Sequence, residues 1–286
     1  MTRAIFKLET LRGQVAEWKR EGLRVGFVPT MGALHAGHVS LIELALRHSD
    51  RVVCSIYVNP TQFGEGEDLD AYPRTEDSDV EKLRAAGCHA AYMPSNLYPD
   101  GFATRVEVDG HTAELEGAHR PGHFEGVALV LAKLFNRVMP DVAVFGEKDF
   151  QQLALVRRLV ADLDFPIEVV GAPIARDKAG LALSSRNAYF DEAGLEVARG
   201  LNRVLRGSAE RIESGGDVEE VLAEAEADLL AAGFEAVDYL ELRDAETLGA
   251  VTEATREARL LTVARLAGVR LLDNMRVEVP TKPIPS

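Results

Sequence analysis

The stretch "VPTMGALHAGHVSLI", residues 28–42, decides the fold of the chain around it. It begins at the end of residues 24–28, a mostly apolar run that predicts a strand, and residues 39–48 have the spacing of a helix. Gly32 and Gly37 lie between the two elements and allow the backbone to come close to a ligand. A helix start presents unpaired N–H groups and the positive end of the peptide dipoles. The stretch therefore predicts a strand, a turn that binds an anion such as phosphate, and a helix.

Two histidines, His35 and His38, lie three residues apart at this turn, and we place the helix start near His38 or Val39. This spacing lets both side chains point to the same side of a helical turn. Two imidazole donors there could hold phosphate oxygens whose charge grows during an in-line displacement, which suits phosphoryl or nucleotidyl transfer. The alternative is a pair of surface histidines at a strand-to-helix turn, and spacing alone leaves both open. The motif is neither GxGxxG nor GxxxxGK[ST].

Residues 1–175 alternate short β-branched runs with helical patterns. The runs carry few charges and each is followed by a helix, which is typical of a parallel sheet covered on both faces. We therefore predict a doubly wound, Rossmann-like α/β domain whose ligands bind beyond the carboxyl ends of its strands. The predicted strands are residues 24–28, 52–58, 90–93, 142–145 and 167–174, and the predicted helices are residues 10–21, 39–48, 78–86, 124–138 and 150–162.

Residues 176–286 have a different character and predict a smaller α+β domain, which we interpret as a lid. Two long helices rich in Glu, Arg and Ala are expected at 192–213 and 218–232, on either side of "SGGD". The segments "VDYLELRD" and "LLTVARLAGVRLLDN" that follow predict short strands. The final "PTKPIPS" is Pro-rich, and we expect it to be loosely held.

Composition excludes several classes of protein. The 286 residues suffice for two unequal domains. The formal net charge of -14 argues against general nucleic-acid binding, although a local basic pocket could still bind a small anion. We see no stretch of roughly 20 apolar residues and no secretory signal, so we expect no membrane association and a cytoplasmic location. The two cysteines, Cys54 and Cys88, lack metal-ligand spacing, which argues against thiol or zinc chemistry.

A second polar segment, "FGEKDFQQL", follows the strand predicted at 142–145. It places Gly146, Lys148 and Asp149 at another strand-to-helix junction. A lysine there can bind phosphate as a point charge, and the aspartate can cap the helix or bind a ribose hydroxyl. The alternative is an ordinary helix cap beside a solvated lysine.

Two more segments have polar side chains suited to a ligand. "GLALSSRNAYF" places Ser184, Ser185 and Arg186 in a loop at the domain boundary, where they could clamp a triphosphate. By itself this is also a generic polar loop. "IYVNPTQFGEGEDLDAYPRT" follows the strand predicted at 52–58, and the amides of Asn59 and Gln62 could bind a hydroxy acid.

Taken together and in this order, the motifs resemble those of the pantoate–β-alanine ligase family, which shares the HxGH signature of adenylyl-transferring enzymes. The resembling segments are "PTMGALHAGHVSLI", "VNPTQFGEGEDLDAYPRT", "YPDGFATRVEV", "LEGAHRPGHFEGVALVLAKLFN", "FGEKDFQQL", "GLALSSRN" and "LLDN". Many adenylyltransferases have HxGH, whereas its combination with "FGEKDxQQ" and "LSSRN" is far more specific. Phe150 and Leu183 depart from the family pattern, which more often has Tyr and Met there.

The resemblance implies a two-step reaction. Pantoate and ATP would give an enzyme-bound pantoyl adenylate and pyrophosphate, and β-alanine would then displace AMP to give pantothenate. ATP would be a substrate, with Mg²⁺ carried on its phosphates. The implied partners are small molecules and a second copy of the chain, in a homodimer formed through the first domain.

The resemblance also assigns residues. His38 would have an acid role and would act with His35, Lys148 and Arg186 on the phosphates, while Gln62 and Gln152 would bind pantoate, Gln62 also lying near β-alanine. Protein ligands of the metal stay unassigned, with Asp77 and Asp79 considered. The implied ATP site consists of Met31, Gly32, Ala33, Leu34, His35, Ala36, Gly37, His38, Gly146, Glu147, Lys148, Asp149, Ala175, Leu183, Ser184, Ser185 and Arg186.

Two other hypotheses use the same motifs. One is an HxGH adenylyltransferase that attaches AMP to a phosphate ester and needs no amine. The other is a non-catalytic module that binds ATP and reports it to a partner. The number of groups aimed at a reacting phosphate argues against the second hypothesis, since plain binding requires fewer.

Overall fold

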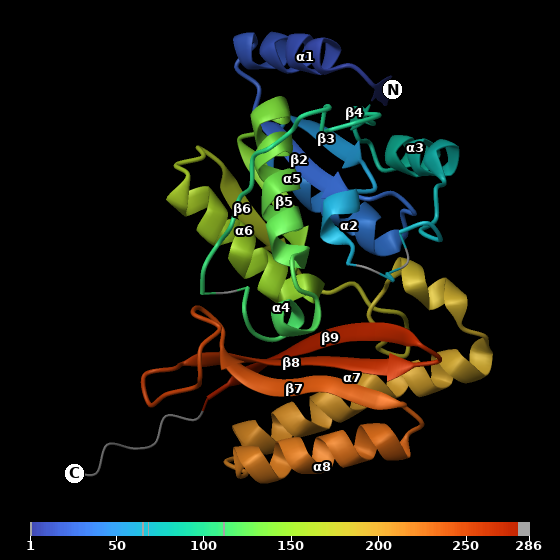
Figure 1. Cartoon of the computed structure of the whole chain (residues 1–286), viewed down its shortest axis with the longest axis vertical. Coiled ribbons are helices and arrows are strands. Elements are labelled where there is room, and N and C mark those ends of the chain that lie inside the picture. The colour runs from blue at the N-terminus through green and yellow to red at the C-terminus, as the bar shows by residue number, and fades with distance from the viewer. Residues whose placement is uncertain (1, 65, 68, 111, 280–286) are drawn as a thin grey trace. The chain divides into compact units, whose positions relative to one another are not determined.

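The computed structural model describes residues 2–64, 66–67, 69–110 and 112–279, so the Pro-rich tail at 280–286 lies outside the described residues. The chain divides into two compact units (Figure 1). The first contains the residues up to Glu147 together with Gln151–Ile174, and the second contains Lys148–Phe150 and the residues from Ala175 onward. The sequence places the boundary after residue 175, whereas the contacts group Ala175 and Lys148–Phe150 with the second unit.

The first unit is built on a six-stranded parallel sheet in the order β1-β4-β3-β2-β5-β6. This confirms the predicted doubly wound α/β class. The three-residue β1 was not predicted, because a strand that short has too little pattern to recognise. The strands are β1 (Arg3–Ile5), β2 (Val25–Thr30), β3 (Arg51–Ile56), β4 (Ala90–Tyr92), β5 (Val142–Gly146) and β6 (Glu168–Ala172).

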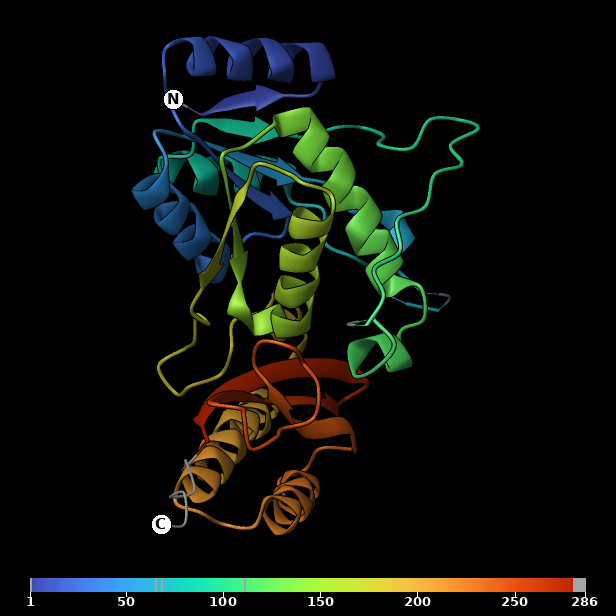
Figure 2. The same cartoon turned by 90° about the vertical axis from the view of Figure 1, so that its left-hand side faces the viewer.

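Helices cover both faces of this sheet, because its strands are apolar on both sides. One core cluster joins the sheet to α1, α5 and α6, and a second joins it to α2 and α3. Figure 2 shows α5 and α6 on one side of the sheet and α2 on the other. The helices are α1 (Leu8–Arg20), α2 (Ala36–His48), α3 (Glu76–Ala85), α4 (Glu116–His119), α5 (His123–Val138) and α6 (Phe150–Asp162), with short 3₁₀ turns η1 (Pro60–Gln62) and η2 (Glu147–Asp149).

The second unit is α+β, as predicted. Its antiparallel sheet has the order β7-β8-β9, and α7 and α8 pack together on one face (Figure 1). The strands have nine or ten residues and are longer than the short strands expected. A two-residue turn, Ala267 and Gly268 with φ of 48° and 74°, joins β8 to β9 in one continuous hairpin. The elements are η3 (Ser185–Tyr189), α7 (Glu192–Glu213), α8 (Val218–Ala231), β7 (Ala236–Asp244), β8 (Glu257–Leu266) and β9 (Val269–Glu278).

Both cysteines are buried free thiols. Burial raises the pKa of Cys54 well above its ordinary value and raises the pKa of Cys88 to about 12. A thiol with so high a pKa stays protonated near neutral pH, so these groups pack as small apolar side chains. Over the part of the chain that the structure describes, no helix is long and apolar enough to cross a membrane.

Candidate active site

The strand order of the first unit reverses beside β2. The chain places β3 and β4 on one side of β2 and places β5 and β6 on the other. β2 and β5 are direct neighbours, with Gly26 opposite Val142. Ligands of doubly wound sheets bind beyond the carboxyl ends of the strands where the order reverses. The HxGH segment leaves β2 at this point, and Gly146 and Glu147 leave β5 at the same point.

The loop between β2 and α2 is held in an unusual conformation. Ala33 has a φ of 50°, in the left-handed region that costs a residue with a Cβ roughly 1 to 2 kcal/mol. Asp79 of α3 holds this loop, because its carboxylate accepts hydrogen bonds from the N–H groups of Ala33 at 2.9 Å and Leu34 at 2.8 Å. Asp79 is 0% exposed. Its oxygens therefore face the loop backbone, whereas the sequence had offered Asp79, like Asp77, only as a possible ligand of the metal.

The two histidines cap α2, which is why this helix begins at Ala36, before the expected start. The Nδ1 of His35 accepts from the Gly37 N–H at 3.1 Å, and the Nδ1 of His38 accepts from the His35 N–H at 3.2 Å. The two ring centroids lie 4.1 Å apart. Some N–H groups that were expected to be open for phosphate are thus bonded to the histidines themselves.

These caps determine the tautomer of both rings. A backbone N–H can only donate, so each Nδ1 must offer a lone pair, and the neutral ring then carries its proton on Nε2. Each of His35 and His38 therefore has its N–H donor at the far end of the ring. The sequence could not say which nitrogen has this role.

Gln62 lies beside the HxGH loop. Its amide nitrogen lies 3.0 Å from the sulfur of Met31, and its amide oxygen accepts from Asn59 at 3.0 Å. Asn59 is 1% exposed, and its own oxygen accepts from Thr61 and from the hydroxyl of Tyr98. The side chain of Asn59 therefore holds Gln62 and the turn around it, and binding of a hydroxy acid by Asn59 stays a prediction.

The main-chain carbonyl of Gln62 is held by the start of α5. It accepts from Nδ1 of His123 at 2.8 Å and from Arg120 at 3.3 Å. Arg120 also bonds both oxygens of Glu67, at 2.6 and 2.7 Å, and this hydrogen bonding lowers the pKa of Glu67. Gly126 allows α5 to pack closely against the backbone of Thr61 and Gln62, because a Cβ at this position would lie 2.1 Å from the Thr61 carbonyl oxygen.

Lys148 and Asp149 pack with the second unit. The Lys148 carbonyl accepts from the side chain of Asn274 at 2.8 Å, and its Nζ lies 3.9 Å from Asp149. The next residue, Phe150, lies under the guanidinium of Arg259, 4.1 Å from the ring centroid. Tertiary contacts therefore hold the backbone of Lys148 and Phe150 in place. The alternative of a freely solvated lysine does not require such contacts.

The "LSSR" segment is built on paired backbone. The N–H of Leu183 donates to the carbonyl of Ala175 at 2.9 Å, which brings together two residues expected at the ATP site. Ser184 caps the short η3 by accepting from the Arg186 N–H at 3.3 Å. Ser185 begins η3, so the segment has a defined conformation.

A comparison with protein families matches the model of pantoate-beta-alanine ligase to residues 3–276. The chain belongs to this family.

Family members with known sequences and structures support the assignment. Pantothenate synthetase of Rhodospirillum rubrum is 56% identical over 270 residues, covering 93% of this chain and 96% of that protein. That of Mesorhizobium japonicum is 52% identical over 277 residues, covering 96% and 98%. A crystal structure of pantothenate synthetase from Thermus thermophilus has a TM-score of 0.90 and 46% identity, covering 96% and 99%. Pantoate-beta-alanine ligase from Francisella tularensis, complexed with beta-gamma ATP and beta-alanine, has a TM-score of 0.80 and 30% identity, covering 96% and 97%.

The residues expected from the ligase family fall into two groups. Met31–His38, Gly146, Glu147, Gln62 and Gln152 belong to the first unit, and Lys148, Asp149, Ala175 and Leu183–Arg186 belong to the second. Gln152 is half-buried in the first turn of α6, whereas the neighbouring Gln151 is buried and bonds the backbone at Glu114 and Glu116.

Several supporting roles were missed from the sequence. Asp79, which was considered only as a metal ligand, holds the HxGH loop, and Arg120 and His123 hold the backbone of Gln62. The family-like segments "LEGAHRPGHFEG" and "LLDN" were recognised without a role for any residue in them. Asp79 lies in "EDSDVEKLRA" and His123 in "AHRPGHFEG", both polar segments, so no local pattern marks their burial or names their partners.

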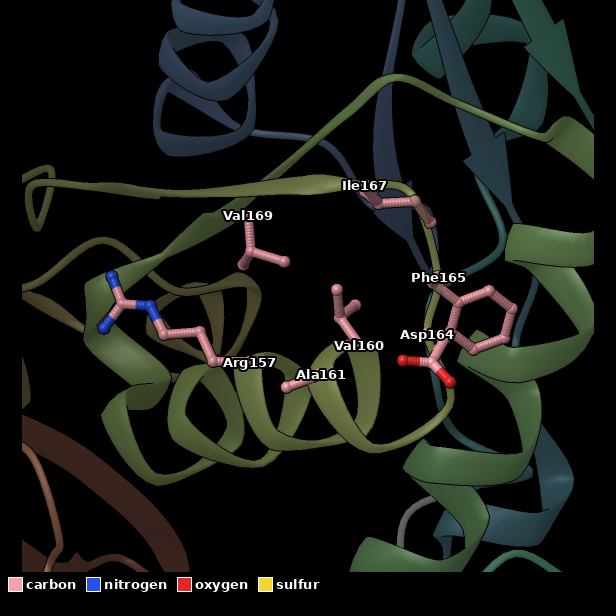
Figure 3. Close-up of a pocket in the computed structure, with 7 residues that line it drawn as sticks. All are labelled: Arg157, Val160, Ala161, Asp164, Phe165, Ile167 and Val169. Carbon is pink, nitrogen blue, oxygen red and sulfur yellow. The ribbon is translucent and has the colours of Figure 1, made fainter.

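A groove between α6 and β6 lies elsewhere in this ligase fold (Figure 3). Its volume is about 560 Å³, and its lining combines the charged side chains of Arg157 and Asp164 with apolar side chains such as Phe165. It adjoins Glu168, where β6 begins, at the amino ends of the strands. The HxGH loop leaves the opposite, carboxyl end of the sheet, so this groove is not the candidate active site.

The pH dependence of stability should report on His123. A carbonyl only accepts and a guanidinium only donates, so Nδ1 of His123 donates to Gln62 while its Nε2 accepts from Arg120. Burial, followed by the charge of Arg120, lowers the pKa of His123 from its ordinary 6.5. A lowered pKa means that the stabilisation present above pH 6.5 is lost as the pH falls through the folded-state pKa.

We expect the wild type to lose more free energy of unfolding than the His123→Asn variant between about pH 7.5 and about pH 5.5. The asparagine amide can still donate to the Gln62 carbonyl but does not titrate. Urea unfolding of both proteins at each pH measures the difference, and the lowered pKa of His89 contributes equally to both. Equal losses in the two proteins would show that His123 is not buried as a neutral acceptor for Arg120.

Proposed function

We propose that this chain is an ATP-dependent ligase that condenses pantoate with β-alanine to pantothenate through a pantoyl adenylate, releasing AMP and pyrophosphate. The observation that carries this proposal is the HxGH loop, held by Asp79 at the point where the sheet order reverses, in a member of the pantoate-beta-alanine ligase family. Its two imidazoles each have an N–H donor at the far end of the ring.

In the first step the pantoate carboxylate attacks the α-phosphorus of ATP. A new oxygen–phosphorus bond forms while the bond to the leaving pyrophosphate breaks. Donors aimed at the oxygens that gain charge stabilise this transition state by roughly 3 to 4 kcal/mol each. We assign this work to Nε2–H of His35 and of His38, with Lys148 and Arg186 as the cations that neutralise the phosphates.

Gln62 and Gln152 are the residues we assign to pantoate. Gln62 points its amide nitrogen at the Met31 sulfur, which is a weak acceptor. A pantoate hydroxyl can therefore replace this contact with a gain in hydrogen-bond strength. The carbonyl of Gln62, held by His123 and Arg120, fixes the backbone from which the side chain extends.

In the second step the neutral amine of β-alanine attacks the acyl carbon of the adenylate. The bond to AMP breaks, and the amine proton leaves as the amide forms. The enzyme contributes by holding the two reactants in line, since orientation alone supplies several kcal/mol. The Francisella tularensis relative was crystallised with both an ATP compound and β-alanine, which supports binding of both substrates in one fold.

Mg²⁺ enters this proposal as part of the ATP substrate. Among residues 2–64, 66–67, 69–110 and 112–279, no group of three or more His, Cys, Asp or Glu side chains is arranged to hold a metal ion. The ATP phosphates would supply the ligands, in keeping with the preference of Mg²⁺ for phosphate and water oxygens. We further propose a homodimer, from the family resemblance, and a cytoplasmic location, where ATP is abundant.

The test is a coupled assay on the purified full-length chain. With MgATP and pantoate we expect exchange of pyrophosphate into ATP, and on adding β-alanine we expect pantothenate and AMP in equal amounts. Pyrophosphate release without amide formation would refute the ligase and leave an adenylyltransferase. ATP binding with no exchange would indicate a non-catalytic nucleotide-binding module.

A further inference from the structure

Two adjacent residues, Asp273 and Asn274, lie midway along β9 (Val269–Glu278) in the second unit. They are 3% and 1% exposed. Successive residues of a strand point to opposite faces, so the pair reaches both sides of β9. Asp273 alternates with Leu271 and Val277 along β9 and so shares their face, on which both residues belong to hydrophobic clusters that include α7. A carboxylate in that position needs strong partners, because burying an unpaired charge is costly.

The partner of Asp273 is Arg176, at the base of the "LSSR" segment. The two guanidinium nitrogens lie 2.6 and 2.8 Å from the two carboxylate oxygens, the bidentate geometry of a strong ion pair. Arg176 also donates to the Gly180 carbonyl at 3.0 Å and pairs its backbone with Ala182. The Arg176–Asp273 ion pair therefore fixes the segment that enters the turn at Gly180 and the segment that leaves it, directly before Leu183–Arg186.

Asn274 bonds to the Lys148 segment, the other segment that carries a cation. Its side-chain nitrogen donates to the Lys148 carbonyl at 2.8 Å. Lys148 is separated from Asn274 by 126 residues of sequence, so this bond is a purely tertiary contact. Asp273 and Asn274 are also joined to each other, because the Asn274 N–H donates to the Asp273 carboxylate at 2.7 Å.

We propose that Asp273 and Asn274 are positioning residues that set the Lys148 segment and the Leu183–Arg186 segment relative to each other from one point of β9. The proposal rests on the proposed function, since it concerns the spacing of the two cations that act on the phosphates of ATP. A displacement of about 1 Å in such a group can slow a reaction by about 100-fold. Neither residue is assigned a contact with substrate.

Asp238 provides a matched control in the same sheet. It is also buried among arginines, with Arg265 and Arg270 each 2.6 Å from one of its oxygens. These contacts join β7 to the β8–β9 hairpin and involve neither the Lys148 segment nor the "LSSR" segment. Asp238→Asn therefore removes the charge of a buried aspartate without touching the phosphate-directed residues.

The experiment compares Asp273→Asn, Asn274→Ala and Asp238→Asn in the full-length protein. Pantoate-dependent exchange of pyrophosphate into ATP is measured at a temperature where each variant is fully folded by circular dichroism. We expect Asp273→Asn and Asn274→Ala to lose roughly 10- to 100-fold in kcat/KM, with a raised KM for ATP and a nearly unchanged KM for pantoate. Asp238→Asn should lose stability while keeping wild-type kinetic constants.

A second pair of variants keeps the test decisive if Asp273→Asn does not fold. Asp273→Glu preserves the charge and both oxygens but moves the ion pair by one methylene, and Arg176→Lys preserves charge without the bidentate geometry. Both should fold and show the same rise in KM for ATP. If the wild type is active and the Asp273, Asn274 and Arg176 variants all have the kinetic constants of Asp238→Asn, the positioning role is refuted. The proposed function would still stand. A wild type that exchanges no pyrophosphate would instead refute the proposed function, and this inference with it.

Discussion

Replacing His38 by Ala is expected to lower pantoate-dependent exchange of pyrophosphate into ATP by about 100- to 1,000-fold, because one donor to the charged transition state is lost. ATP binding should largely survive, since the variant keeps every other residue that we expect at the ATP site. The exchange rate and the dissociation constant for ATP, measured on the same preparation, separate the two effects. His48→Ala, at the other end of α2, is the matched control and should leave both unchanged.

Two further variants separate the two nitrogens of His38. The Nδ1 of this ring accepts from the His35 N–H and helps to cap the helix. His38→Asn keeps an acceptor near that position and loses the distal donor, whereas His38→Gln keeps a donor near the position of Nε2. We expect more activity in the Gln variant than in the Asn variant. The reverse order would mean that His38 acts only by shaping the loop.

Replacing Asp79 by Ala is expected to destabilise the protein by roughly 2 to 4 kcal/mol, because the N–H groups of Ala33 and Leu34 lose their buried acceptors. The exchange reaction should also slow by about 100-fold, since the HxGH loop is then free to leave its left-handed conformation at Ala33. Urea unfolding gives the first quantity and steady-state kinetics at a permissive temperature gives the second.

The design includes a graded variant and a control on the same helix. Asp79→Asn keeps one acceptor oxygen and should fall between the wild type and Asp79→Ala in both measurements. Glu81→Ala removes an exposed carboxylate of α3 and should change neither. Full activity in a folded Asp79→Ala protein would show that the loop conformation does not depend on this carboxylate.

The alternation of strands and helices in the first unit was predictable, because buried parallel strands need apolar side chains on both faces and leave a clear pattern. The predicted strand 24–28 and helix 150–162 match β2 and α6 closely. Short elements were not predicted, because the three residues of β1 and the four of α4 have too little periodicity to recognise. The start of α2 was misplaced because an imidazole cap is not among the usual capping side chains.

Within the candidate site, residue type predicted the segments but did not distinguish candidate ligands from supporting residues. Asn59 and Gln62 are both amides three residues apart, and nothing in the sequence separates them. In the structure Asn59 is enclosed by Thr61, Tyr98 and Gly126, whereas Gln62 extends toward Met31. Burial distinguishes the supporting residue from the candidate ligand, and burial is a property of the packed fold.

The sequence by itself determined the α/β class, the smaller α+β unit and the resemblance to the ligase family, because these depend on local pattern and on residue types that few other functions require together. Only the tertiary structure decided what holds those segments: Asp79 behind the HxGH loop, His123 behind Gln62, and Asn274 behind Lys148. Each of these contacts joins residues 45 or more positions apart. A hydrogen bond of this kind exists only after the strands have paired and the helices have packed, so no local pattern encodes it.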